Sequence, residues 1–135
     1  MTVTKATQLH GDRGQGELIR AHRLYMGLSQ RDIARRLEFD RRDYQRIESG
    51  TNPAPPGFLA KVEALSDKFA ADVDLLIEEA ERRGGLALSY EVDTRKPEAE
   101  RDEWNRLVAG RAAVETSADA PITLTVNVGK VERSA

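Results

Sequence analysis

The stretch LSQRDIARRLEFDRRDYQRIESG, residues 28–50, decides the fold, because it places two short amphipathic segments close together. Ser29 followed by Asp32 gives the first segment an N-cap with a capping-box partner three residues on. Asp40 can cap the second segment, and Gly50 supplies its C-terminal stop. Neither segment can bury its apolar face alone, so the pattern predicts a helix-turn-helix. The residues expected to point inward are Leu28, Ile33, Ala34 and Leu37 in the first segment and Tyr44 and Ile47 in the second.

The outward face of the second segment is rich in side chains that suit DNA recognition. Arg presents a planar fork that pairs bidentately with guanine, and the major groove admits one α-helix. The alternative interpretation is that charges on a short helix simply face water, as most such runs do. Because the caps, the spacing and the charge all agree, the pattern favours a recognition helix. Its outward residues are Arg41, Arg42, Asp43, Gln45 and Arg46.

A series of residues in this region follows the pattern of a known family: Leu28, Ser29, Gln30, Ile33, Ala34, Leu37, Phe39, Arg46, Ile47, Glu48 and Gly50. Over about residues 17–70 the chain resembles the lambda-repressor-like (XRE) helix-turn-helix family. Two positions depart from the family pattern. Glu38 stands where the family usually turns with Gly, and Tyr44 stands where it usually has a smaller apolar residue.

The resemblance implies roles for individual residues. Arg23 and Glu48 fall on a buried pair that ties the first helix of the family to the third. Gln30 falls on the position that touches phosphate and braces the reading side chains. The family's base-reading positions are occupied by Arg41, Arg42, Asp43 and Arg46. Contacts to the DNA backbone, or braces for the readers, are expected from Ser29, Gln30, Gln45, Thr51 and Asn52.

Length and composition limit the possible class of protein. At 135 residues with 39% hydrophobic content, the chain suits one ordinary domain or two very small ones, and we expect two small units. It has no Cys, which excludes disulfides and thiolate zinc sites. No apolar run approaches the ~20 residues of a membrane span, and residues 1–16 lack the pattern of a signal peptide. We therefore expect a cytoplasmic protein that is nucleoid-associated when bound to DNA.

The formal net charge of −2 is unevenly distributed along the chain. Residues 20–46 hold eight Arg against four acidic residues, whereas residues 47–135 hold eleven basic and seventeen acidic residues. Screening confines an electrostatic field to about 8 Å at physiological salt, so a local positive face is enough to attract phosphate. The acidic remainder is expected to limit non-specific binding.

The segments on either side of the motif predict the domain organisation. Residues 1–16 contain three Gly and few apolar residues, which indicates a mobile tail, although Lys5 and Arg13 leave a DNA-contacting arm as an alternative. A first helix is expected from Glu17 to Gly27. After a proline-containing loop, apolar residues at helical steps predict one unbroken helix over 56–83, with Pro56 in its first turn, although the family usually breaks this segment near Asp67. Residues 17–83 then form the DNA-binding domain and residues 84–135 a second domain.

After Gly84 and Gly85 the apolar residues no longer recur at helical spacing but at every second position. Alternating residues over 86–92 and 122–128 predict two half-buried strands. Between them lies a helix-forming region, residues 96–115, with Trp104, Leu107, Val108 and Ala112 along one face. The layout, with Glu103 and Trp104 opening that helix, is similar to the YdiL-like repressors that include anti-CRISPR-associated autoregulators. This narrower resemblance implies a C-terminal dimerisation unit.

Two short strands do not form a stable sheet alone, so we expect a second copy of the chain to supply two more. The same copy would cover the apolar stripe of the long helix. The residues expected at this dimer interface are Leu65, Phe69, Val73, Leu76, Leu88, Tyr90, Trp104, Leu124 and Val126. The fold class predicted is mainly α: an N-terminal helix-turn-helix bundle, a long connecting helix and a small α+β dimerisation unit.

Catalytic and metal-binding patterns find little support in the sequence. His10 and His22 are the only imidazoles, and without Cys they make no recognisable ligand set. We expect no enzyme activity, no cofactor and no metal. The sequence instead predicts a dimeric repressor, phage-related or autoregulatory, that reads an inverted repeat in double-stranded DNA. The alternative is an antitoxin that binds a toxin protein and regulates its own operon.

Overall fold

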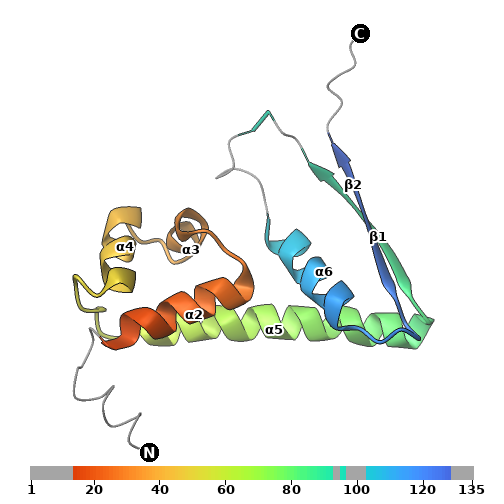
Figure 1. The fold of residues 1–135 in the computed structure, drawn as a ribbon, viewed down its shortest axis with the longest axis horizontal. Helices are drawn as coiled ribbons and strands as arrows, with labels where there is room; N and C mark the ends of the chain where they lie inside the picture. The colour runs from red at the N-terminus through yellow and green to blue at the C-terminus, as the bar shows by residue number, and fades with distance from the viewer. Residues whose placement is uncertain (1–13, 93–94, 97–102, 129–135) are drawn as a thin grey trace, which may run out of the picture. The chain divides into compact units, whose positions relative to one another are not determined.

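The computed structural model describes residues 14–92, 95–96 and 103–128 (Figure 1). The chain divides into two compact units, unit 1 over Met1–Lys68 and unit 2 over Phe69–Ala135. The described elements are α2 (Gly16–Met26), α3 (Gln30–Arg36), α4 (Arg41–Ser49), α5 (Phe58–Arg83), β1 (Leu86–Val92), α6 (Trp104–Glu115) and β2 (Ile122–Val128). Most of the predicted N-terminal tail lies outside the described residues.

The helix ends of unit 1 follow the predicted capping signals. The Ser29 side chain accepts a hydrogen bond from the Asp32 N–H at 3.0 Å, which caps α3. Asp40 caps α4 through the Asp43 N–H, also at 3.0 Å. Gly50 ends α4 in the left-handed conformation, with φ 86°. The helix-turn-helix predicted from residues 28–50 is therefore confirmed.

Glu38 adopts the backbone conformation that the usual Gly would adopt in the turn between α3 and α4. Its φ is 55°, in the left-handed region, and it is the one non-Gly residue with positive φ in the described part of the chain. Left-handed backbone costs a non-Gly residue roughly 1–2 kcal/mol. The Phe39 N–H donates to the Ala34 carbonyl at 2.9 Å and helps to close the turn. The departure from the family pattern at this position therefore leaves the turn geometry intact.

The core of unit 1 forms where α2, α3, α4 and the start of α5 meet. Tyr44 is fully buried, and its ring lies 6.2 Å from that of Phe58, which also packs against Phe39 at 4.9 Å. Gly16, the first residue of α2, passes so close to α4 that an added Cβ would lie 2.4 Å from the Ile47 carbonyl oxygen. The buried apolar residues of this unit are Ile19, Met26, Leu28, Ile33, Ala34, Tyr44, Ile47, Ala54, Phe58 and Val62.

The long helix α5 is unbroken from Phe58 to Arg83, as its periodicity predicted. The break near Asp67 that is usual in the family is absent, although the boundary between the two units falls close by, after Lys68. The prediction that Pro56 lies in the first helical turn is wrong. Gly57 has a left-handed φ of 80°, which separates Pro56 from the helix.

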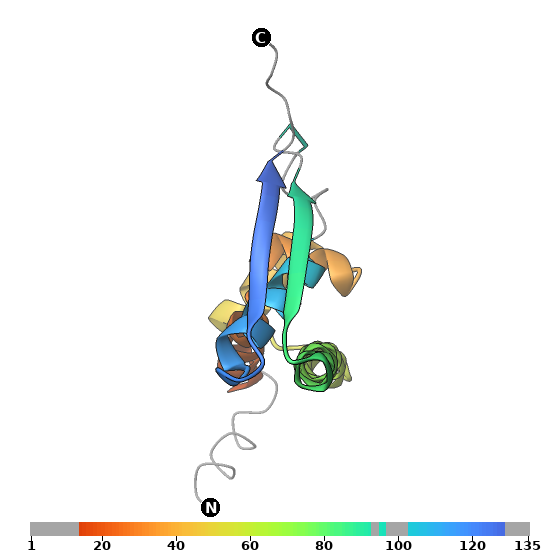
Figure 2. The same ribbon diagram turned by 90° about the vertical axis from the view of Figure 1, so that its right-hand side faces the viewer.

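Unit 2 pairs its two predicted strands with each other in a parallel sheet. The register places Leu86 beside Ile122 and Val92 beside Val128 (Figure 2). Parallel strands require a crossover, and here the connection contains α6. The Trp104 ring meets Phe69 of α5 edge-on, with ring centroids 5.4 Å apart, and its Nε1 donates to the Asp72 Oδ2 at 2.9 Å.

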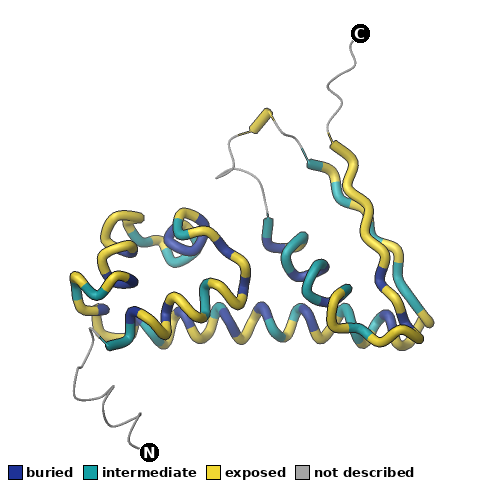
Figure 3. The backbone as a smooth tube through the Cα atoms, in the orientation of Figure 1, coloured by how far each residue is buried: buried dark blue, intermediate teal, exposed yellow. Residues whose placement is uncertain are grey.

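Burial in unit 2 bears on the residues expected at the dimer interface. Phe69, Val73 and Trp104 are already 94% or more buried within the chain, so they do not need a second copy to cover them. Trp104, the first residue of α6, packs against Phe69 of α5 within the same chain. The strands remain open instead, as Figure 3 shows along β2. Leu124 and Val126 are each 41% exposed.

Candidate nucleic-acid interface

The predicted recognition face lies on the exposed side of α4. The helical period places Tyr44, Ile47 and Glu48 on the buried side of this helix. The side chains between them therefore point to solvent. The residues exposed on this side are Arg41, Arg42, Asp43, Gln45 and Arg46. All four predicted base-reading residues thus lie on one accessible helix face.

Asp43 and Arg46 form an ion pair within this face. The Arg46 Nη1 lies 3.3 Å from the Asp43 Oδ1, and both side chains are about half exposed. Exposed pairs of this kind contribute only about 0–1 kcal/mol, so either group can exchange its partner for DNA at small cost. Because Asp40 caps the helix, the Asp43 carboxylate is not needed for capping.

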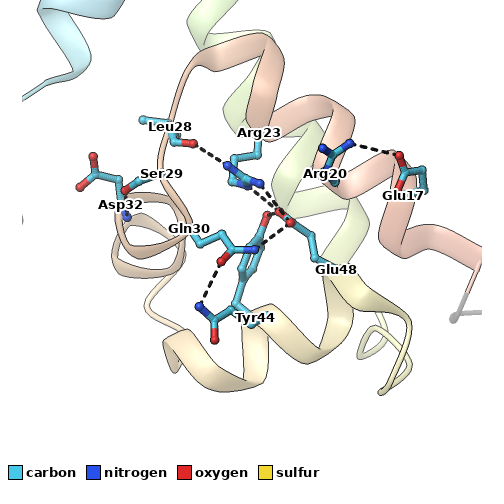
Figure 4. A network of polar contacts seen from close by, with 10 residues as sticks. Glu17, Arg20, Arg23, Leu28, Ser29, Gln30, Asp32, Tyr44 and Glu48 are labelled. Atoms are coloured by element: carbon cyan, nitrogen blue, oxygen red, sulfur yellow. Dashed lines mark hydrogen bonds and ion pairs between the residues drawn. The ribbon is translucent and has the colours of Figure 1, made fainter.

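Gln30 connects the exposed face of α4 to the interior. Its Oε1 accepts from the Gln45 Nε2 at 3.0 Å, and its own Nε2 donates to the Glu48 Oε1 at 2.9 Å (Figure 4). The amide therefore bridges one side chain on the outward face of α4 and one on its buried face. The family resemblance implied a bracing role for Gln30, which stays a prediction.

Glu48 is the centre of a buried polar network, in which side chains of Arg23, Gln30 and Tyr44 donate to its carboxylate. Arg23 donates twice to its carboxylate, from Nε at 2.6 Å and from Nη2 at 3.1 Å. The Tyr44 hydroxyl donates to the Glu48 Oε2 from one turn away on the same helix. Arg23 also donates to the Leu28 carbonyl at 3.0 Å, which ties the α2–α3 connection to the same cluster. The two residues of the implied Arg23–Glu48 pair are thus in direct contact.

The network shifts the ionisation of its members. Burial by itself raises the pKa of Glu48, but the hydrogen bonds from Arg23, Tyr44 and Gln30 outweigh burial, and the pKa is lowered. Burial, reinforced by the hydrogen bond to Glu48, raises the pKa of Tyr44. The hydrogen bond to Glu48 raises the pKa of Arg23. The pair is therefore held in its ionised form, and the tyrosine is held neutral.

The remaining residues expected near the DNA backbone lie at the ends of α3 and α4. Ser29 caps α3, and the Thr51 Oγ1 lies 3.0 Å from the Ser49 Oγ just after α4. The Asn52 N–H donates to the Arg46 carbonyl at 3.0 Å. A surface depression between α3 and α4 is lined by Gln30, Arg42, Gln45, Arg46 and Ser49.

Two contributors to this site were not predicted from the sequence. Ser49 lines the depression, and the Tyr44 hydroxyl holds Glu48. The spacing of four residues between Tyr44 and Glu48 was the available signal, because side chains four apart lie together on a helix. Tyr44 was expected only to pack.

Neither a metal cluster nor a membrane helix accompanies this interface in the part of the chain that the structure describes. There, no group of three or more His, Cys, Asp and Glu side chains is placed to hold a metal ion. No described helix combines the length and apolarity needed to cross a bilayer. His22 instead lies 3.0 Å from the Ser66 Oγ, through its Nδ1, and links α2 to α5.

Comparison with known families finds one match, which covers somewhat less than half of the chain. Residues 16–78 match the family model for a helix-turn-helix domain, from the first residue of α2 into α5. The match supports a helix-turn-helix DNA-binding protein, and hence a DNA-binding regulator, a class that is typically non-enzymatic. No curated protein and no solved structure matches the chain.

Proposed function

We propose that this protein is a sequence-specific transcriptional repressor that binds an inverted-repeat operator as a homodimer. The observation that carries the proposal is the exposed face of α4, where three Arg side chains and Gln45 are presented on a capped helix. Behind that face, Glu48 joins the helix to Arg23 of α2 and to Gln30 of α3. A rigid, positively charged helix of this size suits the major groove.

In this proposal α4 lies in the major groove and its side chains read base edges. Arg41, Arg42 and Arg46 pair with guanine, to which Arg can donate two hydrogen bonds. Asp43 accepts from a cytosine amino group once Arg46 turns to the DNA. Ser29, Gln30, Thr51 and Asn52 contact the sugar-phosphate backbone and fix the register without reading sequence.

The homodimer supplies the symmetry that an inverted repeat requires. A two-fold axis would place the two copies of α4 about 34 Å apart, one turn of DNA, with half-sites about 10 base pairs apart or a multiple of that. The layout of unit 2, a strand, a helix opened by Glu103 and Trp104, and a second strand, supports the narrower assignment to YdiL-like autoregulatory repressors. A repressor of that kind would bind its own promoter.

The experiment that tests this function is a binding-site selection with the purified full chain, followed by titration of variants. We expect Arg42→Ala and Arg46→Ala each to lose about 1–3 kcal/mol of binding free energy and to relax specificity at one position. Gln30→Ala should weaken binding to all sequences alike. The control is Arg82→Ala, which removes the same positive charge from an exposed position on α5. We expect it to leave DNA binding unchanged.

Two results would contradict the proposal. If the selection enriches no sequence, the protein does not bind DNA sequence-specifically. If a sequence is enriched but the α4 variants bind it as tightly as the parent, α4 is not the reading element.

A further inference from the structure

The outer edge of β2 has backbone groups available for a further strand. The Leu86 N–H donates to the Pro121 carbonyl at 2.9 Å, and Leu86 is paired with Ile122. In a parallel ladder this register directs the N–H and C=O groups of Thr123, Thr125 and Asn127 toward β1. Those of Leu124 and Val126 therefore point away from β1, to an edge beside which no strand lies in the described part of the chain (Figure 2).

The sequence of β2 lacks two features that usually protect an edge strand, charged residues and proline. Proteins blunt such edges with charged residues, proline or bulges. The seven residues of β2, ITLTVNV, include no charged residue and no proline. The other strand, β1, carries Glu91 among the residues whose backbone faces its own outer edge. Of the two edges, that of β2 is the better suited to pairing.

The apolar side chains of β2 are also left open. Ile122, at the start of the strand, is buried, whereas exposure rises to 41% at Leu124 and Val126 and to 60% at Val128. Their neighbours on the same face of β1, among them Leu88 and Tyr90, are only half-buried. A further strand beside β2 would extend this apolar face and cover its side chains.

The sequence of β2 is complementary to itself. Read from either end, it alternates apolar and polar residues about Thr125 at its centre. An antiparallel copy centred there would set Leu124 opposite Val126 and Thr123 opposite Asn127, and Ile122 opposite Val128. Each apolar residue would then meet an apolar one and each polar residue a polar one, with no like charges opposed.

We propose that β2 pairs antiparallel with β2 of a second copy of this chain, with the two-fold axis passing beside Thr125. The result is a continuous four-stranded sheet in which the two β2 strands are central and the two β1 strands form the edges. This inference rests on the homodimer of the proposed function and names the interface that forms it. An isologous contact of this kind closes on itself and leaves the β2 edge covered.

The proposed register makes Thr125 a site for covalent capture. Because its backbone groups face β1, Thr125 and its copy form a non-hydrogen-bonded antiparallel pair, with Cα atoms about 4.5 Å apart. That distance lies within the range that a disulfide spans. The chain has no cysteine of its own, so a single introduced thiol can react only with its copy or with added reagent.

The test is disulfide formation by Thr125→Cys in the full chain under mild oxidation, with Ser89→Cys as the matched control. Ser89 is the residue that pairs with Thr125 in the sheet, and it is exposed at the centre of β1. We expect Thr125→Cys to form a covalent dimer about tenfold faster or more than Ser89→Cys, since only the first pair lies within bridging distance. Light scattering of the uncross-linked parent at the same concentration gives the mass independently.

The outcomes separate this interface from the proposed function. A dimeric mass with rapid cross-linking at position 125 supports the β2 interface. A dimeric mass with equal or faster cross-linking at position 89 overturns it and leaves the homodimer standing. A mass near the 15.0 kDa of one chain overturns both the interface and the homodimer, whether or not the protein binds DNA.

A proline pair provides a second measurement that does not depend on thiol chemistry. Val126→Pro removes an N–H from the outer edge of β2, whereas Ser89→Pro removes one from the outer edge of β1, and neither removes a bond between the two strands. We expect dimerisation to weaken with Val126→Pro and to persist with Ser89→Pro. The opposite order would place the interface on β1 and overturn the proposal.

Discussion

Unit 1 and unit 2 differ in the kinds of side chain that they bury. Among the described residues, five of the six largest fully buried side chains lie in unit 1 and one, Phe69, lies in unit 2; the five are Tyr44, Ile19, Met26, Ile33 and Val62. Unit 1 also encloses a charged residue, Glu48, and satisfies its carboxylate with side-chain donors. Unit 2 leaves apolar side chains of its sheet in solvent.

The difference indicates that the two units are suited to different roles. A DNA-reading helix must be held in one orientation, and a buried, fully paired polar network defines such an orientation because breaking any part of it is costly. A sheet with an open apolar face and an unprotected edge is suited to association. Three predictions test this contrast, in order of decreasing effect.

The largest effect is expected from Glu48→Ala. Removing one partner of a buried ion pair costs about 3–5 kcal/mol, because the remaining charge, here Arg23, is left without its counter-charge. Amide hydrogen exchange in α2 to α4 should accelerate strongly. Fluorescence of Trp104, the chain's one tryptophan, reports unit 2 in the same sample.

The matched control for this change is Glu17→Ala. Glu17 also pairs with an arginine of α2, Arg20, but its side chain is 80% exposed. Exposed pairs contribute only about 0–1 kcal/mol, so we expect little change. Equal stability of Glu48→Ala and Glu17→Ala would show that the buried network does not hold unit 1 together.

An intermediate effect is expected from adding a methyl group at Gly16. The new Cβ would lie 2.4 Å from the Ile47 oxygen and 2.9 Å from the Glu48 oxygen, both of them backbone atoms of α4. Overpacking of this kind costs about 1–3 kcal/mol, so Gly16→Ala should lower the unfolding midpoint in urea.

Gly110→Ala is the contrasting change in unit 2. Gly110 lies inside α6 with nothing within 4 Å of an added Cβ, and Ala is preferred to Gly within a helix by about 0.5–1 kcal/mol. We therefore expect a small increase in stability. A gain in stability at both positions would mean that α2 does not approach α4 as closely as the structure has it.

The smallest effect on stability is expected from lowering the pH. Because the pKa of Glu48 is lowered in the folded protein, its ionised carboxylate stabilises the fold above the unfolded-state value of about 4.3. That contribution is lost as the pH falls through the folded-state pKa. Urea unfolding of the parent and of Glu48→Gln, between pH 7 and pH 3, should show a steeper loss for the parent. Parallel profiles would mean that Glu48 titrates normally.

Local signals in the sequence predicted most elements of the structure correctly. Ser29 and Asp40 were recognised as caps because a cap acts on an N–H only three residues away. The bounds of β1 and β2 followed from strict alternation. The error at Pro56 arose because proline suits both a first helical turn and the turn before it, and the left-handed Gly57 decided between them.

Contacts between distant residues were harder to predict. The sequence identified Trp104 as apolar and large, but not that Asp72, 32 residues away, would accept its N–H and that Phe69 would cover its ring. The burial of Trp104 within its own chain was therefore not predicted. The Tyr44 hydroxyl was missed as a donor because its role depends on where Arg23 and Gln30 place the Glu48 carboxylate.

The sequence by itself determined the helices, their caps, the two strands and the outward face of α4, because each depends on periodicity and on hydrogen bonds within a few residues. The tertiary structure alone decided that β1 and β2 are parallel, that Trp104 of α6 packs against Phe69 of α5, and that Glu48 joins three helices. These features depend on which distant segments meet. The burial of whole apolar faces decides which segments meet, and no short stretch of sequence is enough to predict it.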